Sequence, residues 1–196
     1  MKLVNLPKTV RGQKTLKRIT DAAELVFYEK GYNGSTIKDI ASEAEVSVGT
    51  IYIYFNDKKS IYDYLLLQYS KYIRMYISKR IEGIKDRREA ERLGILVFLD
   101  IVKEKKYIYN IIWESLYIDK EKFVDYYMSF AEHYKLEIEK AMERGDMKEY
   151  DPEIVAWTMM GVSNFIGLRY VMFDNTENLE EIADEVIRIL DEGLFK

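Results

Sequence analysis

Apolar residues recur along much of this chain at intervals of three and four, the spacing that places side chains on one buried face of a helix. Between residues 14 and 30 the apolar positions are Leu16, Ile19, Ala23, Val26 and Phe27. Gly31 follows as a C-terminal stop, and residues 32–34 turn the chain. Residues 1–13 show no such periodicity, so we expect a flexible arm there.

Two short helices are expected next. Ser35 or Thr36 caps the first, with Asp39 three residues after Thr36 as a partial capping box. Its inner face consists of Ile37, Ile40, Ala41 and Ala44. Ser47 is a favourable N-cap for the second helix, residues 48–55, because its hydroxyl can accept a free backbone N–H of the first turn.

Longer helices fill the rest of the sequence. Asp57 caps one that we expect from Lys58 to about Ile84, and five more follow at about residues 88–105, 107–118, 120–144, 152–173 and 178–194. The run Asp151-Pro152-Glu153 marks a helix start, with an N-cap, a proline at the first helical position and an acid facing the helix dipole. Since no strand alternation or sequence repeat is found, the pattern predicts an all-α chain of about nine helices.

The composition limits the possible function classes. The chain has 196 residues, of which 48% are hydrophobic and 33% charged, as in a folded globular protein. It contains no cysteine, which excludes disulfides, thiolate nucleophiles and Cys-ligated zinc and suits a cytoplasmic protein. No run of about 18 apolar residues occurs, so we expect no membrane span or membrane partner. Residues 1–18 also lack the apolar stretch of a secretory signal.

The charge is unevenly distributed. Residues 1–59 carry 10 Lys and Arg against 7 Asp and Glu, whereas residues 60–196 carry 20 against 27. A basic end on an acidic body is typical of a protein that binds a polyanion at one end. So small a positive excess also arises by ordinary fluctuation, so charge alone does not establish nucleic-acid binding.

The two short helices, joined by a three-residue turn and backed by the helix before them, form a helix-turn-helix unit. In such a unit the second short helix can enter the major groove of DNA. Residues 47–55 read Ser-Val-Gly-Thr-Ile-Tyr-Ile-Tyr-Phe. Helical spacing turns Ile51 and Phe55 towards the core and leaves Gly49, Thr50 and Tyr52 elsewhere. Gly49 lets the backbone approach base edges, at about 1 kcal/mol of helix stability relative to alanine.

Several of these stretches resemble one known family. They are Arg18-Ile19-Thr20-Asp21-Ala22-Ala23, Gly31-Tyr32, Thr36-Ile37-Lys38-Asp39-Ile40-Ala41, Val46-Ser47-Val48-Gly49-Thr50-Ile51-Tyr52 and Tyr54-Phe55-x-x-Lys58. With its turns in register, this segment resembles the DNA-binding domain of the TetR repressor family. The resemblance implies an N-terminal arm and helix-turn-helix domain over residues 1–57. It implies a helical ligand-binding and dimerisation domain over residues 58–196, where the match is only in outline.

The resemblance also implies two kinds of contact with double-stranded operator DNA. The positions that would face base edges are Lys38, Val48, Gly49, Thr50 and Tyr52. The positions that would hold phosphates are Thr36, Ser47, Tyr54 and Lys58. From the residues alone, Tyr54 could equally cap the hydrophobic cluster, and Lys58 could be a solvated lysine. The basic residues of the arm either reach the adjacent minor groove or form a solvated tail: Lys2, Lys8, Arg11 and Lys14.

One turn position departs from the family pattern. The residue before Val46 is often glycine in the family, and here it is Glu45. A positive φ at this glutamate would cost about 1 kcal/mol, and its charge would lie near the DNA. The departure concerns the geometry of the turn.

The last two predicted helices carry more apolar surface than one chain needs. Residues 152–173 are apolar nearly all round, and residues 178–194 carry an apolar stripe. Together they resemble the four-helix dimer interface of the family, formed by two helices from each subunit. A homodimer through these helices also fits DNA reading, because each half-site needs its own recognition helix.

Aromatic residues are frequent in the same body, and the resemblance implies that some of them bind a small-molecule effector. The candidates are Tyr109, Trp113, Tyr117, Tyr127, Phe130, Tyr134 and Phe165. Tyrosine and tryptophan offer apolar surface with a few polar groups, which fits a small, largely apolar ligand. An acyl chain or its thioester is the example that the family suggests. Ordinary core packing remains the simpler explanation for any one of these residues.

Catalysis is not expected. The chain lacks cysteine and a phosphate-binding glycine loop, and Phe130 stands where a Glu-x-x-His diiron motif would need glutamate before His133. We therefore expect no enzyme activity, no cofactor and no metal site. The sequence predicts a DNA-binding regulator, most simply a homodimeric repressor released from a palindromic operator by its ligand. The alternative is a ligand-independent or activating member of the same family.

Overall fold

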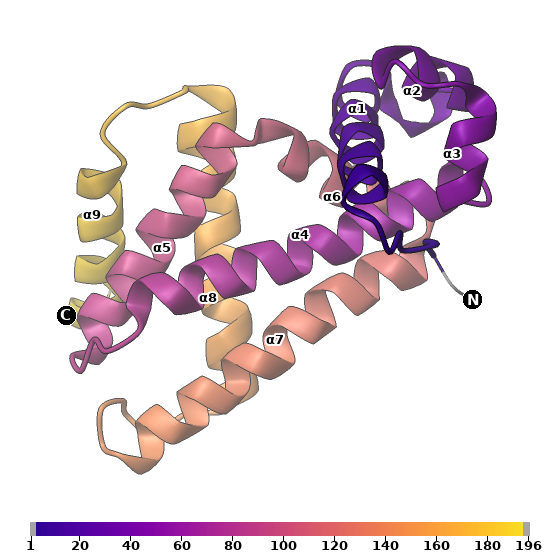
Figure 1. Cartoon of the computed structure of the whole chain (residues 1–196). Coiled ribbons are helices and arrows are strands. Elements are labelled where there is room, and N and C mark those ends of the chain that lie inside the picture. Colours follow the sequence, from indigo (N-terminus) through magenta and orange to yellow (C-terminus); the bar gives the residue numbers. More distant parts are fainter. Residues whose placement is uncertain (1–2, 194–196) are drawn as a thin grey trace. The chain divides into compact units, whose positions relative to one another are not determined.

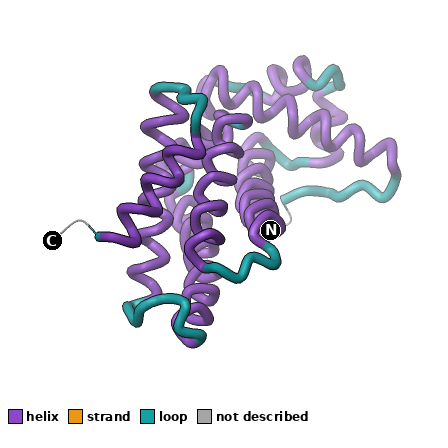
Figure 2. Tube along the Cα trace, turned by 90° about the vertical axis from the view of Figure 1, so that its left-hand side faces the viewer, coloured by secondary structure: helices purple, strands orange, loops and turns teal. Residues whose placement is uncertain are grey.

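The computed structural model describes residues 3–193, and every regular element within that range is a helix (Figures 1 and 2). The α-helices are α1 (Val10–Gly34), α2 (Ile37–Glu43), α3 (Val48–Tyr54), α4 (Lys58–Ile81), α5 (Arg87–Glu104), α6 (Lys106–Ile118), α7 (Lys120–Glu143), α8 (Pro152–Gly167) and α9 (Leu179–Glu192). A π-helical segment, η1 (Leu168–Phe173), continues α8. The predicted all-α fold is confirmed, with most helix bounds within a few residues of the prediction.

The chain forms two compact units. The first contains the residues up to Ser70 together with Tyr107–Tyr126, and the second contains Lys71–Lys106 and the residues from Tyr127 onwards. Both α4 and α7 therefore contribute residues to each unit. The first unit extends past residue 57 and includes α6, so it is larger than the predicted DNA-binding domain. A functional boundary at residue 57 stays a prediction.

In the first unit, α2 packs against both α1 and α3. The side chains predicted to form the core are almost fully buried: Ile19, Phe27, Ile40, Ile51 and Phe55. Phe27 and Tyr32 both pack edge-on against the buried ring of Tyr62 on α4, and their own rings are tilted against each other. This core fixes the helix-turn-helix unit to the start of α4.

The N-terminal segment corrects one prediction. Helix α1 begins at Val10 and not at residue 14, because the hydroxyl of Thr9 accepts the backbone N–H of Gly12 (3.1 Å). Before it, Val4 is buried and the backbone N–H of Asn5 donates to the carbonyl of Tyr54 (2.8 Å). The described part of the predicted flexible arm is therefore ordered against α3, whereas Lys2 lies outside the described residues.

In the second unit, α5 packs against α8 and α9. Arg88 on α5 forms an ion pair with Asp191 on α9 (2.6 Å), and Arg92 forms another with Asp184. Helix α8 begins as predicted, with Asp151 as the N-cap and a proline in the first turn.

Candidate nucleic-acid interface

The α1–α2 turn is closed by three groups that converge on Tyr32. Gly31 has a φ of 67°, a conformation that favours glycine, and it interrupts the helical backbone of α1 at the predicted stop. Residues 32–34, which were predicted as a turn, add a last helical turn beyond this kink. The carboxylate of Glu114 on α6 accepts the backbone N–H of Tyr32 (2.8 Å). From the other side, Lys58 donates through Nζ to the carbonyls of Tyr32 and Ser35, the latter at 2.7 Å. Local sequence patterns give no signal for either long-range contact.

The predicted capping box at the start of α2 is confirmed in both halves. The Thr36 hydroxyl accepts the N–H of Asp39 (3.2 Å), and the Asp39 carboxylate accepts the N–H of Thr36 (2.8 Å). The same carboxylate pairs with Lys30 (2.5 Å). The Thr36 hydroxyl also donates to this carboxylate. The hydrogen bond from Lys30 first, and that from the Thr36 hydroxyl second, lower the pKa of Asp39 to about 2. The N-terminus of α2 is thus fixed by charge-assisted hydrogen bonds.

The turn between α2 and α3 has the positive φ at Glu45 whose cost was considered in the sequence analysis. Glu45 has a φ of 50°, and the N–H of Val46 reaches back to the carbonyl of Ala41 (3.0 Å), as in a Schellman-type helix end. The guanidinium of Arg18 on α1 donates to the carbonyls of Ala44 and Glu45, the latter at 3.0 Å. Arg18 therefore holds the turn, a role that its place in the motif did not reveal.

Helix α3 presents one face to the core and another to solvent. Ser47 caps it as predicted, since its hydroxyl accepts the N–H of Thr50 (3.1 Å). Ile51 is fully buried, whereas Tyr52 is 51% exposed and Gly49 is exposed. The exposed face carries hydroxyl, apolar and backbone groups, the kinds that contact base edges in a major groove.

The residues predicted to contact DNA differ in their exposure to solvent. Exposed or half-buried positions are Thr36, Lys38, Ser47, Val48, Gly49, Thr50 and Tyr52. Tyr54 is only 7% exposed, which favours its alternative role as a cover over the hydrophobic cluster. The Nζ of Lys58 is held by two carbonyls and lies over the ring of Tyr32 (4.2 Å to the centroid). For both residues, a phosphate contact stays a prediction.

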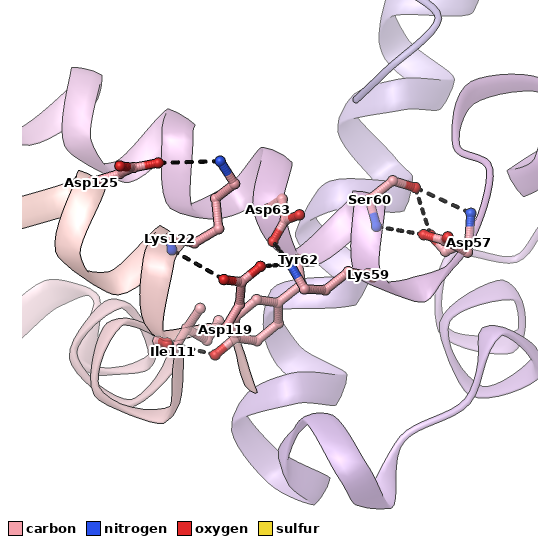
Figure 3. A network of polar contacts seen from close by, with 9 residues as sticks. All are labelled: Asp57, Lys59, Ser60, Tyr62, Asp63, Ile111, Asp119, Lys122 and Asp125. Carbon is pink, nitrogen blue, oxygen red and sulfur yellow. Dashed lines mark hydrogen bonds and ion pairs between the residues drawn. The ribbon is translucent and has the colours of Figure 1, made fainter. Parts of the chain in front are cut away.

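The start of α4 carries a polar network that joins it to α6 and α7 within the first unit. Lys59 lies between Asp63 (2.5 Å) and Asp119 (2.7 Å), and the hydroxyl of Tyr62 donates to the carbonyl of Ile111 (2.6 Å) (Figure 3). Burial by itself lowers the pKa of Lys59, but the two carboxylates outweigh it and raise that pKa. Lys59 therefore stays protonated, but its positive charge is balanced by the two carboxylates and is not free to bind DNA.

The predicted effector-binding residues fall into both units. In the first unit, Tyr109 is buried and stacks on Trp113 (6.4 Å between ring centroids), whereas Tyr117 is 88% exposed. In the second unit, Tyr127 stacks on Trp157 (6.4 Å), Tyr134 donates a hydrogen bond to Glu91, and Phe130 is half-buried. Phe165 is 63% exposed. Their common role in ligand binding stays a prediction.

Two searches of the described residues 3–193 concern other kinds of site. Within this range, no three or more acidic or histidine side chains are grouped as metal ligands. No helix in the same range is long and apolar enough to cross a membrane.

Comparison with known proteins agrees with the helix-turn-helix geometry. Residues 19–65 match the family model described as bacterial regulatory proteins, tetR family. The chain belongs to the TetR family. It is 28% identical over 196 residues to YvdT, an HTH-type transcriptional regulator of Bacillus subtilis (strain 168), an alignment that covers 96% of this chain and 98% of YvdT. This TetR-family chain is therefore a DNA-binding transcriptional regulator.

Two solved structures share its fold over nearly the whole chain. The fatty acid degradation regulator FadR from Bacillus halodurans superposes with a TM-score of 0.83 at 22% identity, covering 96% of this chain and 98% of FadR. FadR from Bacillus subtilis, solved in complex with stearoyl-CoA, gives a TM-score of 0.79 at 22% identity, covering 92% of this chain and 100% of that one. At these identities the likeness concerns the fold.

Proposed function

We propose that this regulator is a homodimeric repressor that leaves a palindromic operator when a small, largely apolar ligand binds. The exposed face of α3 carries the proposal. Ile51 and Phe55 bury one side of the helix, so Gly49, Thr50 and Tyr52 are the side of α3 available to a major groove. Lys38 and Val48 complete the base-reading group, and helix N-termini at Thr36 and Ser47 supply donors for phosphates.

The dimer is supported by exposed apolar side chains on the last two helices. On α8 these are Ile154, Trp157 and Phe165, and on α9 they are Ile189 and Leu190. Both helices pack against α5, and exposed apolar side chains of this size commonly mark a protein interface. A two-fold dimer through α8 and α9 would give two recognition helices, one for each half-site of a palindrome.

The effector is proposed to be an acyl-CoA thioester or a molecule of similar shape. The aromatic content of the helical body supports an apolar ligand, and the FadR of Bacillus subtilis with the same fold was solved with stearoyl-CoA. We propose that ligand binding displaces α4, which, like α7, contributes residues to both units. Such a ligand must have different affinities for the DNA-bound and released conformations, whatever its absolute affinity.

The proposed interface is tested by two matched substitutions. Phe165→Asp and Tyr150→Asp each place a charge on an aromatic position that is about two-thirds exposed, but only Phe165 lies on α8. Sedimentation velocity should show a dimer for the wild type and Tyr150→Asp, and monomers for Phe165→Asp. A monomeric wild type, or a dimeric Phe165→Asp, would contradict this interface.

Release is tested with a labelled duplex bearing the sequence that the protein selects from a random DNA pool. Fluorescence anisotropy should fall as stearoyl-CoA is added, whereas free coenzyme A should leave the complex intact. If a series of acyl-CoA esters of different chain length leaves operator binding unchanged, the release mechanism is wrong. The regulator would then be a ligand-independent member of the family, and an activator if its deletion lowers transcription of the regulated gene.

A further inference from the structure

The recognition helix α3, like any α-helix, leaves its last carbonyls without an N–H of its own to accept. It has seven residues, Val48–Tyr54, and ends where Phe55 donates its N–H to the carbonyl of Ile51 (2.9 Å). The carbonyls that follow have no N–H of the helix to accept. Helices this short are marginal in water unless other groups hold them. Whatever satisfies the end of α3 therefore controls how firmly its DNA-facing residues are held.

That partner is Asn5, which lies 48 residues earlier in the chain. Its side-chain Nδ2 donates to the carbonyl of Ile53 (3.1 Å), and its backbone N–H donates to the carbonyl of Tyr54 (2.8 Å). One residue thus caps the last two carbonyls of the helix. The neighbouring Val4 is 9% exposed, so its burial fixes the segment in place next to these hydrogen bonds.

The other end of the same segment is fixed to α1. Thr9 caps α1, and a Cβ added to Gly12 would lie 2.6 Å from the Cβ of Pro7, a distance that forces a displacement. Gly12 is therefore the residue that lets Pro7 pack on the first turn of α1. We call residues 3–9 the N-terminal clasp, since it is anchored to α3 at Asn5 and to α1 at Pro7 and Thr9.

We propose that the N-terminal clasp positions the recognition helix for reading DNA, with Asn5 as the positioning residue. Tyr52 and Ile53, both exposed, stand in the last turn of α3, where Asn5 holds the carbonyls. Without these hydrogen bonds the last turn of α3 frays, and Tyr52 has to be ordered again each time the protein binds its operator. The cost falls on sequence-specific binding, because non-specific binding depends on charge and not on the orientation of Tyr52. The DNA part of this proposal rests on the proposed function.

Two variants loosen the clasp from opposite ends. Asn5→Ala removes the side-chain donor, and Gly12→Ala displaces Pro7 without changing Asn5. Leu6→Ala is the matched control, because Leu6 lies in the clasp with its side chain 65% exposed. Asn5→Gln keeps an amide donor and serves as the rescue variant.

Amide hydrogen exchange, followed by mass spectrometry over residues 50–56, measures the clasp without any DNA. We expect exchange in α3 to accelerate about threefold to tenfold in Asn5→Ala and Gly12→Ala, which is the loss of one hydrogen bond expressed as a rate. Exchange in α4 should stay unchanged, and Leu6→Ala should behave as wild type. Unchanged exchange in α3 for both variants would overturn the clasp.

The second measurement is the ratio of operator to non-specific affinity at one salt concentration. Asn5→Ala should lower operator affinity about threefold to tenfold and leave binding to an unrelated duplex within about twofold. Asn5→Gln should restore most of the loss. If both affinities fall together, Asn5 has no positioning role. If the wild type prefers no sequence, the repressor proposal fails, whereas the exchange experiment still decides whether the clasp holds α3.

Discussion

Gly49 offers a test in which folding and DNA binding should respond in opposite directions. It lies within α3, its φ is not positive, and an added Cβ would find its nearest neighbour, Ser47 Oγ, at 3.8 Å. That is an ordinary van der Waals contact, so the structure admits alanine without displacement. Alanine is favoured over glycine inside a helix by about 1 kcal/mol. In a protein of this size, Gly49→Ala should therefore raise Tm by about 2–4 °C.

The same methyl group would stand on the exposed face of α3, where the backbone is proposed to approach base edges. Losing one well-formed base contact costs about 1–3 kcal/mol, which lowers operator affinity about fivefold to 150-fold. Thermal unfolding at fixed protein concentration and anisotropy titration with the selected operator measure the two effects.

A matched control is Gly94→Ala on α5. There the added Cβ would also find its nearest atom, Ile77 Cγ2, at 3.8 Å, so the helix gains the same propensity far from α3 in the sequence. It should gain stability and bind the operator as wild type does. A stabilised Gly49→Ala with unchanged operator affinity would refute the close approach of α3 to DNA, and a destabilised one would refute the packing argument.

Three further substitutions test the helix-turn-helix frame. Glycine adopts a positive φ without strain, so Glu45→Gly should stabilise the protein by about 1 kcal/mol in urea unfolding. Unchanged or lower stability would contradict the claim that Glu45 is strained. Lys58→Ala leaves the carbonyls of Tyr32 and Ser35 without their charged donor and should destabilise by about 1–3 kcal/mol. A smaller salt slope of DNA binding at unchanged stability would instead identify Lys58 as a phosphate contact. Asp39→Asn should destabilise at pH 7, and because the folded pKa is depressed to about 2, its difference from wild type should shrink as the pH falls from about 4 to 2. A difference as large at pH 2 as at pH 7 would exclude the Asp39 charge as its source.

The local features of the first unit could be predicted from the sequence because each depends on neighbouring residues. The caps at Thr36 and Ser47 and the stop at Gly31 need only a few adjacent positions. The periodicity likewise located Ile51 and Phe55 in the core. For Glu45 the sequence indicated only what a positive φ would cost, because the value of φ itself cannot be read from the sequence.

The contacts that hold the turns in place could not be predicted in this way. Arg18 reaches carbonyls 26 and 27 residues away, and Asn5 reaches carbonyls 48 and 49 residues away. Glu114 accepts an N–H that lies 82 residues earlier in the chain. No periodicity or spacing encodes such pairs, since they form only once the helices have packed. For the same reason, Lys58 was predicted to hold a phosphate, with a solvated lysine as the alternative, and neither prediction anticipated the two carbonyls that hold its ammonium group.

The most direct test of DNA reading by α3 is selection of bound duplexes from a random pool by the purified protein at physiological salt. The account predicts an inverted repeat whose half-site centres lie about one helical turn of DNA apart, or about 34–36 Å. The Tyr52→Ala variant should recover this repeat poorly while retaining non-specific binding. Recovery of no preferred sequence by a folded, dimeric wild type would contradict the central claim that this surface recognises an operator.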